Sequence, residues 1–215
     1  MKMKPKIALF IHQPKCSVQS ANGIISALDD YYSFKIITKH EIEDDFFDDV
    51  SAVCIPGGIG DSDSYDYLMK FHSKRIQRFV NNGGKYLGVC MGAYWADEDY
   101  LNILDNVRVV QYIKQPNACT RRPHAKSMPV NWRGEEKRMY FYDGCSFVGH
   151  NMDVVATYSN GDPMAIIQGQ VGLIGCHPEA EKNWYDSYSW MRKHWNQGQH
   201  KELLLDFVNA LVVER

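Results

Sequence analysis

The most distinctive chemical pattern in the sequence surrounds Cys90, in Gly88-Val89-Cys90-Met91-Gly92. The apolar run Lys85–Val89 predicts a buried strand, and the residues from Met91 onward predict a helix. A nucleophile at such a strand-to-helix turn, with a glycine two residues to either side, has the pattern of a nucleophile elbow. The positive end of the helix favours the thiolate, and the Met91 amide would point toward an oxyanion formed on attack. A structural cysteine at a tight junction fits the same five residues equally well.

A histidine and a carboxylate follow another predicted strand, Val171–Cys176, in the segment Gly175-Cys176-His177-Pro178-Glu179. His177 can act as base for a thiol, and Glu179 can fix the imidazole tautomer and stabilise the imidazolium. A histidine taken alone is more often a surface or core residue, so its assignment depends on the Cys90 segment. Together the two segments predict a catalytic triad of Cys90, His177 and Glu179.

Two loops are candidates for contacting the substrate. Pro56-Gly57-Gly58 follows the predicted strand Val50–Ile55 and exposes backbone N–H groups with little side-chain hindrance, as an oxyanion hole requires. We therefore expect Gly57 to lie at the substrate. Ser17, in the segment Gln13–Gln19 after the first predicted strand, is placed at the sheet edge where ligands bind in such folds. A plain glycine loop and a simple connecting loop are the alternatives for these two segments.

Strand and helix patterns alternate through the first half of the chain, with short apolar runs between stretches of helical spacing. Thr38 and Glu41 form a capping-box pattern that opens a short helical turn. This alternation predicts βαβ units, and hence a parallel sheet covered by helices on both faces. The predicted strands are Ile7–Ile11, Phe34–Ile37, Val50–Ile55 and Lys85–Val89, and the predicted helices are Ser20–Tyr31, Asp66–Asn82 and one from Met91.

Short strands separated by turns fill the second half. Gly161-Asp162-Pro163 and Gln168-Gly169-Gln170 are typical of hairpin turns, so antiparallel hairpins extend the sheet or lie beside it. We expect one α/β domain over residues 1–215, with a doubly wound, mainly parallel sheet. The strands predicted in this half are Val107–Gln111, Met128–Trp132, Arg138–Tyr142, Val154–Tyr158, Ala165–Gln168 and Val171–Cys176, followed by a helix at Leu203–Val213.

Composition limits the kinds of partner. The chain has 24 lysines and arginines against 26 aspartates and glutamates, a net charge of −2, which favours no nucleic-acid partner. Six scattered cysteines without a C-x-x-C pair indicate reduced thiols and a cytoplasmic protein. The sequence shows no signal-peptide pattern and no apolar run of the roughly 20 residues that a membrane span needs. The histidines lack metal-ligand spacing, and we expect no metal and no cofactor.

The order of the Pro-Gly-Gly loop, the Gly-x-Cys-x-Gly elbow and the His-Pro-Glu segment resembles the class I glutamine amidotransferase-like superfamily. The likeness runs from about Lys6 to Glu179. Phe79–Ala96 is most similar to the group named for the N-terminal region of eukaryotic biotin–protein ligases. The resemblance implies a flavodoxin-like sheet, the triad, and an oxyanion hole from the Gly58 and Met91 amides.

The sequence also departs from that superfamily. Typical glutaminases of this class carry glutamine, or a similar polar residue, four positions after the nucleophile, where it helps to hold the substrate, whereas this chain has Tyr94. A second glutamine-binding segment is not recognisable upstream of His177. The resemblance implies a small-molecule amide substrate and, because no synthetase or biotin-ligase domain is recognisable, a separate synthetase or acceptor subunit.

Two functional hypotheses follow from these observations. The first is a cysteine-dependent amidotransferase or amidohydrolase that acts on an amide, glutamine included, through a thioester. The second is a catalytically idle relative that binds a small molecule or regulates a protein partner. The aromatic segment that starts at Trp184 and ends at Trp195 either walls a pocket near the triad or packs on the core.

Overall fold

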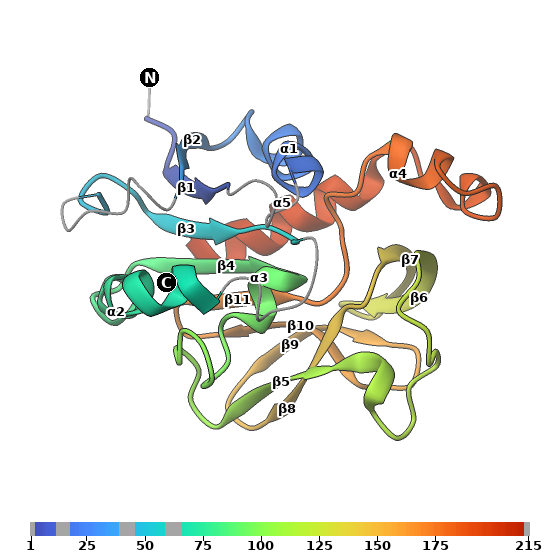
Figure 1. The fold of residues 1–215 in the computed structure, drawn as a ribbon. Helices are drawn as coiled ribbons and strands as arrows, with labels where there is room; N and C mark the ends of the chain where they lie inside the picture. Colours follow the sequence, from blue (N-terminus) through green and yellow to red (C-terminus); the bar gives the residue numbers. More distant parts are fainter. Residues whose placement is uncertain (1–2, 12–17, 39–45, 59–65, 213–215) are drawn as a thin grey trace.

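The computed structural model describes residues 3–11, 18–38, 46–58 and 66–212. They form a nine-stranded sheet with helices on both faces and a separate two-stranded sheet beside it (Figure 1). The strand order of the large sheet is β2-β1-β3-β4-β11-β10-β9-β6-β7. This is the α/β fold with added antiparallel strands that the sequence predicts.

The half of the large sheet that runs from β2 to β11 is parallel. In β11 and β4, Ile174 lies opposite Val89, so these two strands end at the same edge of the sheet. The chain therefore delivers the residues that follow β3, β4 and β11 to one place. The strands of this half are β1 (Lys6–Phe10), β2 (Ser33–Ile37), β3 (Ala52–Ile55), β4 (Lys85–Val89) and β11 (Val171–Ile174).

The other half of the large sheet is antiparallel. β10 pairs with both β11 and β9, which confirms the two predicted hairpin turns between these strands. The second sheet pairs β5 with β8. The strands are β5 (Val107–Gln111), β6 (Lys126–Trp132), β7 (Glu135–Phe141), β8 (Cys145–Gly149), β9 (Asp153–Tyr158) and β10 (Pro163–Gln168).

Amphipathic helices cover the two faces of the large sheet. α1 (Val18–Leu28) packs against α5 (Gln199–Val212), and Ile24 and Phe207 from these two helices share one apolar cluster. α2 (Asp66–Asn81) contributes Ile76 to the cluster on the other face. Shorter helical segments are α3 (Met91–Tyr94), α4 (Lys182–Asp186) and the 3-10 turns η2 (Tyr112–Lys114) and η3 (Arg192–His194).

Two differences from the sequence-based prediction lie close to the elbow. The helix expected from Met91 onward is a single turn that ends at Tyr94. The Asp97 side chain accepts the backbone N–H of Asp99 at 3.3 Å, and such a local bond competes with helix continuation. β8 is not among the predicted strands, and the Glu41 of the predicted capping box lies outside the described residues.

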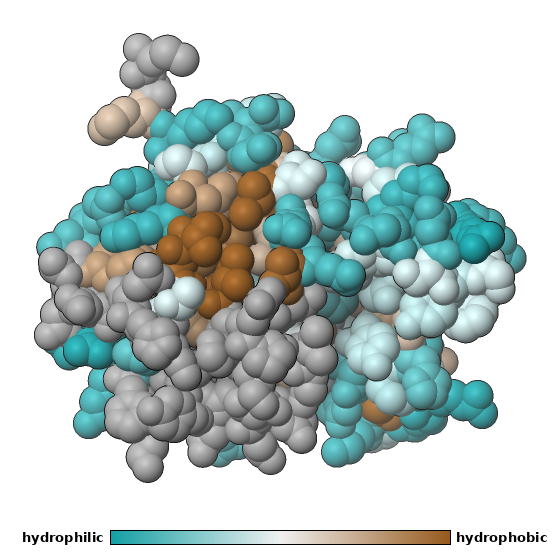
Figure 2. Space-filling model, turned by 45° about the horizontal axis from the view of Figure 1, so that its top comes forward, coloured by the Kyte–Doolittle hydropathy of each residue, from teal (hydrophilic) through white to brown (hydrophobic). Residues whose placement is uncertain are grey.

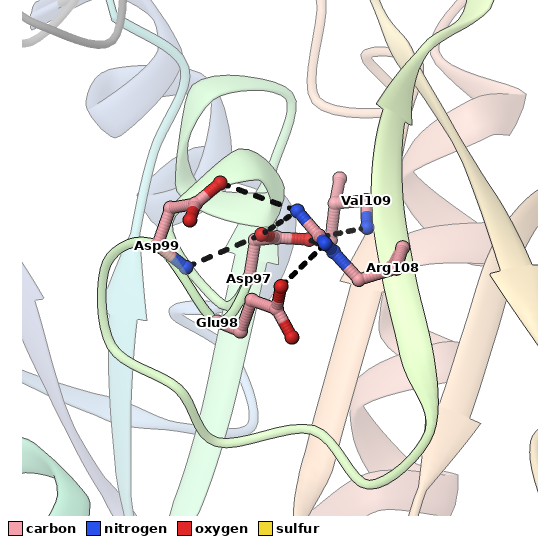
Figure 3. A network of polar contacts seen from close by, with 5 residues as sticks. All are labelled: Asp97, Glu98, Asp99, Arg108 and Val109. Carbon is pink, nitrogen blue, oxygen red and sulfur yellow. Dashed lines mark hydrogen bonds and ion pairs between the residues drawn. The ribbon is translucent and has the colours of Figure 1, made fainter.

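Asp97 joins the segment after the elbow to the second sheet (Figure 3). Its carboxylate, which is 4% exposed, accepts the Val109 backbone N–H at 2.7 Å and the Arg108 Nε–H at 3.1 Å. Arg108 also pairs with the exposed carboxylates of Glu98 and Asp99. The buried carboxylate is thus satisfied by a backbone amide and a guanidinium, and it fixes β5 beside α3.

β2 is an edge strand of the large sheet, and its Ile36 is 46% exposed. Figure 2, in which this side of the molecule comes forward, shows an apolar area bordered by hydrophilic atoms. Within the described part of the chain, no helix has the length and apolar character needed to cross a membrane.

Candidate active site

Cys90 connects β4 to α3 with φ 51° and ψ −103°, a backbone conformation that non-glycine residues rarely adopt. The glycines on either side are sterically required. A Cβ on Gly88 would lie 2.4 Å from the Gly92 carbonyl oxygen, and a Cβ on Gly92 would lie 1.9 Å from the Ile55 carbonyl oxygen. The Tyr86 hydroxyl donates to the Gly92 carbonyl at 2.6 Å and closes the turn. The strained turn expected of a nucleophile elbow is therefore present at Cys90.

His177 and Glu179 follow β11 at the same sheet edge. His177 Nδ1 donates to Glu179 Oε1 at 2.8 Å, and the two residues are 5% and 0% exposed. The His177 backbone N–H donates to the Tyr140 carbonyl at 2.9 Å, which anchors the segment to β7. Cys90 lies near enough to the ring to raise the pKa of His177. The structure thus brings the three residues of the predicted triad together.

The electrostatics of this group favour a charged imidazole. Burial by itself lowers the pKa of His177, but the Glu179 carboxylate and the Cys90 thiol, through charge and hydrogen bonds, outweigh it and raise the pKa to about 10. Because α3 has only one turn, its dipole adds little at Cys90, and the imidazolium is the positive partner for a thiolate. The protonated form of Cys90 has another partner, since Sγ donates to the Tyr142 carbonyl at 3.6 Å.

Ser20 is a member of this site that the sequence did not reveal. Its hydroxyl donates to Glu179 Oε1 at 2.7 Å and accepts the Gly57 backbone N–H at 2.9 Å. The two residues joined by the first bond are 159 positions apart. No local pattern marks Ser20, and only the placement of α1 beside the segment after β11 brings it to the triad.

The Pro-Gly-Gly loop reaches the site, but its two glycines have different surroundings. Gly57 packs on the imidazole, because a Cβ there would lie 2.7 Å from His177 Cε1, and its N–H is directed to Ser20. The Gly58 amide, one residue further on, stays the predicted oxyanion donor from this loop, together with that of Met91. The predicted contact between Gly57 and substrate likewise stays a prediction.

The other two predicted substrate contacts, those of Tyr94 and Ser17, also stay predictions. The Tyr94 hydroxyl donates to the carbonyls of Asp143 and Gly144, each at 3.2 Å, and burial raises the pKa of Tyr94 strongly, so it remains neutral. Tyr94 therefore fastens α3 to the turn between β7 and β8. Ser17 lies outside the described residues.

The aromatic segment after Glu179 packs on the site and on itself. Trp184 lies edge-on to His177, with ring centroids 5.3 Å apart, and Tyr140 lies edge-on to the same ring at 5.9 Å. Trp184, Tyr185 and Met191 form a small apolar cluster with Tyr140, whereas Trp190 is 58% exposed. These rings exclude water from one side of the imidazole, which strengthens its interaction with Glu179.

Comparisons with known proteins bear on the fold. Residues 13–106 match the family model described as the N-terminal region of biotin–protein ligase. PurLQS from Thermotoga maritima superposes with a TM-score of 0.69 at 15% identity, over 97% of this chain and 100% of that one. A glutamine amidotransferase from the same organism gives a TM-score of 0.71 at 14% identity, over 97% of this chain and 98% of that one. The fold is that of a glutamine amidotransferase.

A second glutamine amidotransferase, from Methylobacillus flagellatus, has a TM-score of 0.60 at 11% identity, over 99% of this chain and 94% of that one. The predicted resemblance to the class I glutamine amidotransferase-like superfamily is thus confirmed at the level of the fold. No curated protein matches the sequence significantly. At identities this low the likeness carries the fold alone, and the chemistry is argued from the residues themselves.

Proposed function

We propose that the chain is a cysteine-dependent amidotransferase or amidohydrolase in which Cys90, His177 and Glu179 form the catalytic triad. The observation that carries the proposal is the buried group of Cys90, His177 and Glu179, in which His177 is hydrogen-bonded to Glu179 and Cys90, at a strained strand-to-helix turn, raises the pKa of His177. Perturbed titratable groups of this kind are typical of catalytic sites.

In the proposed reaction the Cys90 thiolate attacks the carbonyl carbon of a small amide. The carbonyl oxygen becomes an oxyanion that the Gly58 and Met91 amides stabilise. The His177 imidazolium then gives its Nε2 proton to the leaving nitrogen, the C–N bond breaks, and the acyl group stays on sulfur as a thioester. His177, now neutral, takes a proton from water as the water attacks the thioester, which releases the acid and restores the thiolate–imidazolium pair.

The proposal includes glutamine among the amides and a separate synthetase or acceptor subunit that receives the ammonia. Glutamine amidotransferases of the same fold support this part of the proposal. The tethered hydroxyl of Tyr94 bears on substrate choice, because it occupies the position where typical glutaminases hold their substrate with a polar side chain.

A trapping assay tests the chemistry. The purified chain is incubated with glutamine and a panel of primary amides in the presence of hydroxylamine, which converts a thioester to a hydroxamate. We expect hydroxamate from the wild-type chain and none from Cys90→Ser or Cys90→Ala. Cys54→Ala is the matched control, because Cys54 is fully buried in β3 and its loss should reduce stability only. Equal hydroxamate formation by the Cys90 and Cys54 variants would refute the assignment.

The tethered Tyr94 also favours a second candidate, an idle relative that binds a small molecule or regulates a protein partner. Iodoacetamide titration across pH separates the two functions. Cys90 in an active triad is alkylated well below pH 8, because the thiolate is held by the imidazolium, whereas in an idle protein it reacts as an ordinary thiol with a pKa of about 8.5.

A further inference from the structure

Ser20 is the point at which three segments of the site meet. It lies in α1, is 0% exposed, and joins the Pro-Gly-Gly loop to the segment after β11 through its bonds to Gly57 and Glu179. One turn further along α1, a Cβ on Gly23 would lie 2.3 Å from the Glu179 carbonyl oxygen. α1 therefore packs directly on the backbone of Glu179 at the same place where Ser20 binds its carboxylate.

The charge of the active site gives this hydroxyl a role beyond packing. In the reactive form the triad holds two negative charges, on Cys90 and Glu179, and one positive charge on His177. The group is buried, so its excess negative charge needs nearby dipoles to stabilise it. Within the described residues, Glu179 Oε2 has no hydrogen-bond partner, and Oε1 is shared by the imidazole and the Ser20 hydroxyl.

We propose that Ser20 is a positioning residue of the triad, whose hydroxyl holds Glu179 against His177 and offsets the negative charge that appears when Cys90 ionises. The inference rests on the proposed function. The Gly57 amide polarises the hydroxyl, because it donates to the same oxygen that donates to Glu179. Ser20 thereby ties the orientation of the acid to the position of the loop that supplies the Gly58 amide.

Removing the hydroxyl should make the ionisation of Cys90 more costly. Formation of the thiolate takes the site from neutral to a net charge of −1, and the variant has one dipole fewer to stabilise that charge. A hydrogen bond to a charged group is worth about one pH unit or somewhat more, and Cys90 feels part of this, because the hydroxyl is bonded to Glu179 whether or not Cys90 is ionised. We expect the acid limb of Cys90 alkylation to move to higher pH by up to about one pH unit in Ser20→Ala, with an up to roughly tenfold lower rate near pH 6.

The titratable groups around the triad do not interfere with the acid limb of the alkylation profile. Among the described residues, the titratable groups that face the triad from the packed elements are Cys54 in β3, Tyr94 in α3, Tyr140 in β7, Cys145 in β8, Cys176 after β11 and Tyr185 in α4. Burial raises the pKa of each of these six side chains, so they stay neutral between pH 5 and pH 8. Titration in that range therefore reports the triad.

The experiment measures the rate of iodoacetamide alkylation at Cys90, by peptide mapping, from pH 5 to pH 9. Ser146→Ala is the matched control, because Ser146 is 1% exposed and its hydroxyl donates to the Pro163 carbonyl at 2.7 Å. It loses a buried hydroxyl bond without touching the triad. Ser20→Thr and Ser20→Val form a second pair of equal shape that differs in the hydroxyl alone, in case alanine prevents folding.

The proposal is supported if the acid limb moves in Ser20→Ala or Ser20→Val and stays in place in Ser20→Thr and Ser146→Ala. It is overturned if the limb is the same in all four variants and the wild-type chain, whatever their thermal stabilities. A wild-type profile like that of an ordinary thiol has a different meaning, because it removes the proposed function itself and with it any triad for Ser20 to position.

Discussion

Replacing Glu179 by glutamine tests whether the charge of the carboxylate keeps His177 protonated. Burial lowers the pKa of His177, while Glu179 and Cys90 raise it to about 10. Glutamine retains the size and an oxygen that can accept the Nδ1 proton, but it carries no charge. Burial then prevails, so we expect the pKa of His177 to fall below its ordinary value of about 6.5.

The consequence for reactivity can be worked out. At pH 6.5 an ordinary thiol, with a pKa of about 8.5, is about 1% ionised, whereas a thiolate paired with an imidazolium is largely ionised. Part of the gain is offset because a less basic thiolate is a weaker nucleophile. We therefore expect the alkylation rate of Cys90 at pH 6.5 to fall about 10- to 100-fold in Glu179→Gln.

The assay compares alkylation at Cys90 with alkylation at Cys119, an exposed thiol on the same chain that serves as an internal reference. Glu181→Gln is the control variant, since Glu181 lies two residues further on and pairs with Lys201 at 3.6 Å. If the pH profile of Cys90 in Glu179→Gln superimposes on that of the wild-type chain, the charge of Glu179 does not support the imidazolium and the reasoning is wrong.

Three more predictions concern stability. Gly92→Ala should cost about 1–3 kcal/mol, because the new Cβ would overlap the Ile55 carbonyl oxygen, and thermal unfolding measures the loss. Asp97→Ala should cost about 1–3 kcal/mol in urea unfolding, because the buried Val109 N–H loses its acceptor. The raised pKa of His177 stabilises the fold fully below pH 6.5, and this contribution should disappear as the pH rises toward 10.

Each of these predictions has a control and a contrary outcome. Gly134→Ala shows the cost of backbone strain without overlap, since its φ is 91° and nothing lies within 4 Å of its Cβ position, and a Gly92→Ala chain as stable as the wild-type chain would contradict the steric argument. Glu98→Gln removes an exposed partner of Arg108 and should change the free energy of unfolding very little. A loss as large as that of Asp97→Ala would contradict the argument from the buried Val109 N–H. For His177, the free energy of unfolding of the wild-type chain is compared with that of His177→Phe from pH 6 to pH 10. A difference that stays constant over this range would contradict the predicted contribution of His177.

The sequence predicts the elbow because its pattern of strand, cysteine and flanking glycines is local. β4 occupies Lys85–Val89 as predicted, and Gly88 is needed for a contact inside the turn, whereas Gly92 is needed for a contact with Ile55 in the neighbouring strand β3. The prediction that His177 and Glu179 lie near Cys90 also required that the parallel strands end at one edge of the sheet. The alternation of strands and helices predicts that parallel sheet, and this alternation is visible in local sequence patterns.

What the sequence did not predict depends on contacts between distant segments. Ser20 was included in the predicted helix Ser20–Tyr31, but its partners lie 37 and 159 positions away. The length of α3 depends on Asp97, whose main partners are in β5. Tyr94 was expected at the substrate because of its position in the chain, and its hydroxyl bonds to the β7–β8 turn became visible only in three dimensions.

The place of β11 in the large sheet has a consequence for folding order. β11 is the last strand along the described residues, yet it lies between β4 and β10 and is the element that joins the parallel half to the antiparallel half. Until it is inserted, β4 and β10 each present an open edge, and such edges are sites of aggregation. Because His177 arrives with β11, a nascent or partly folded chain has Cys90 without its base. During synthesis the thiol therefore gains its partner only after the strand that seals the sheet has emerged.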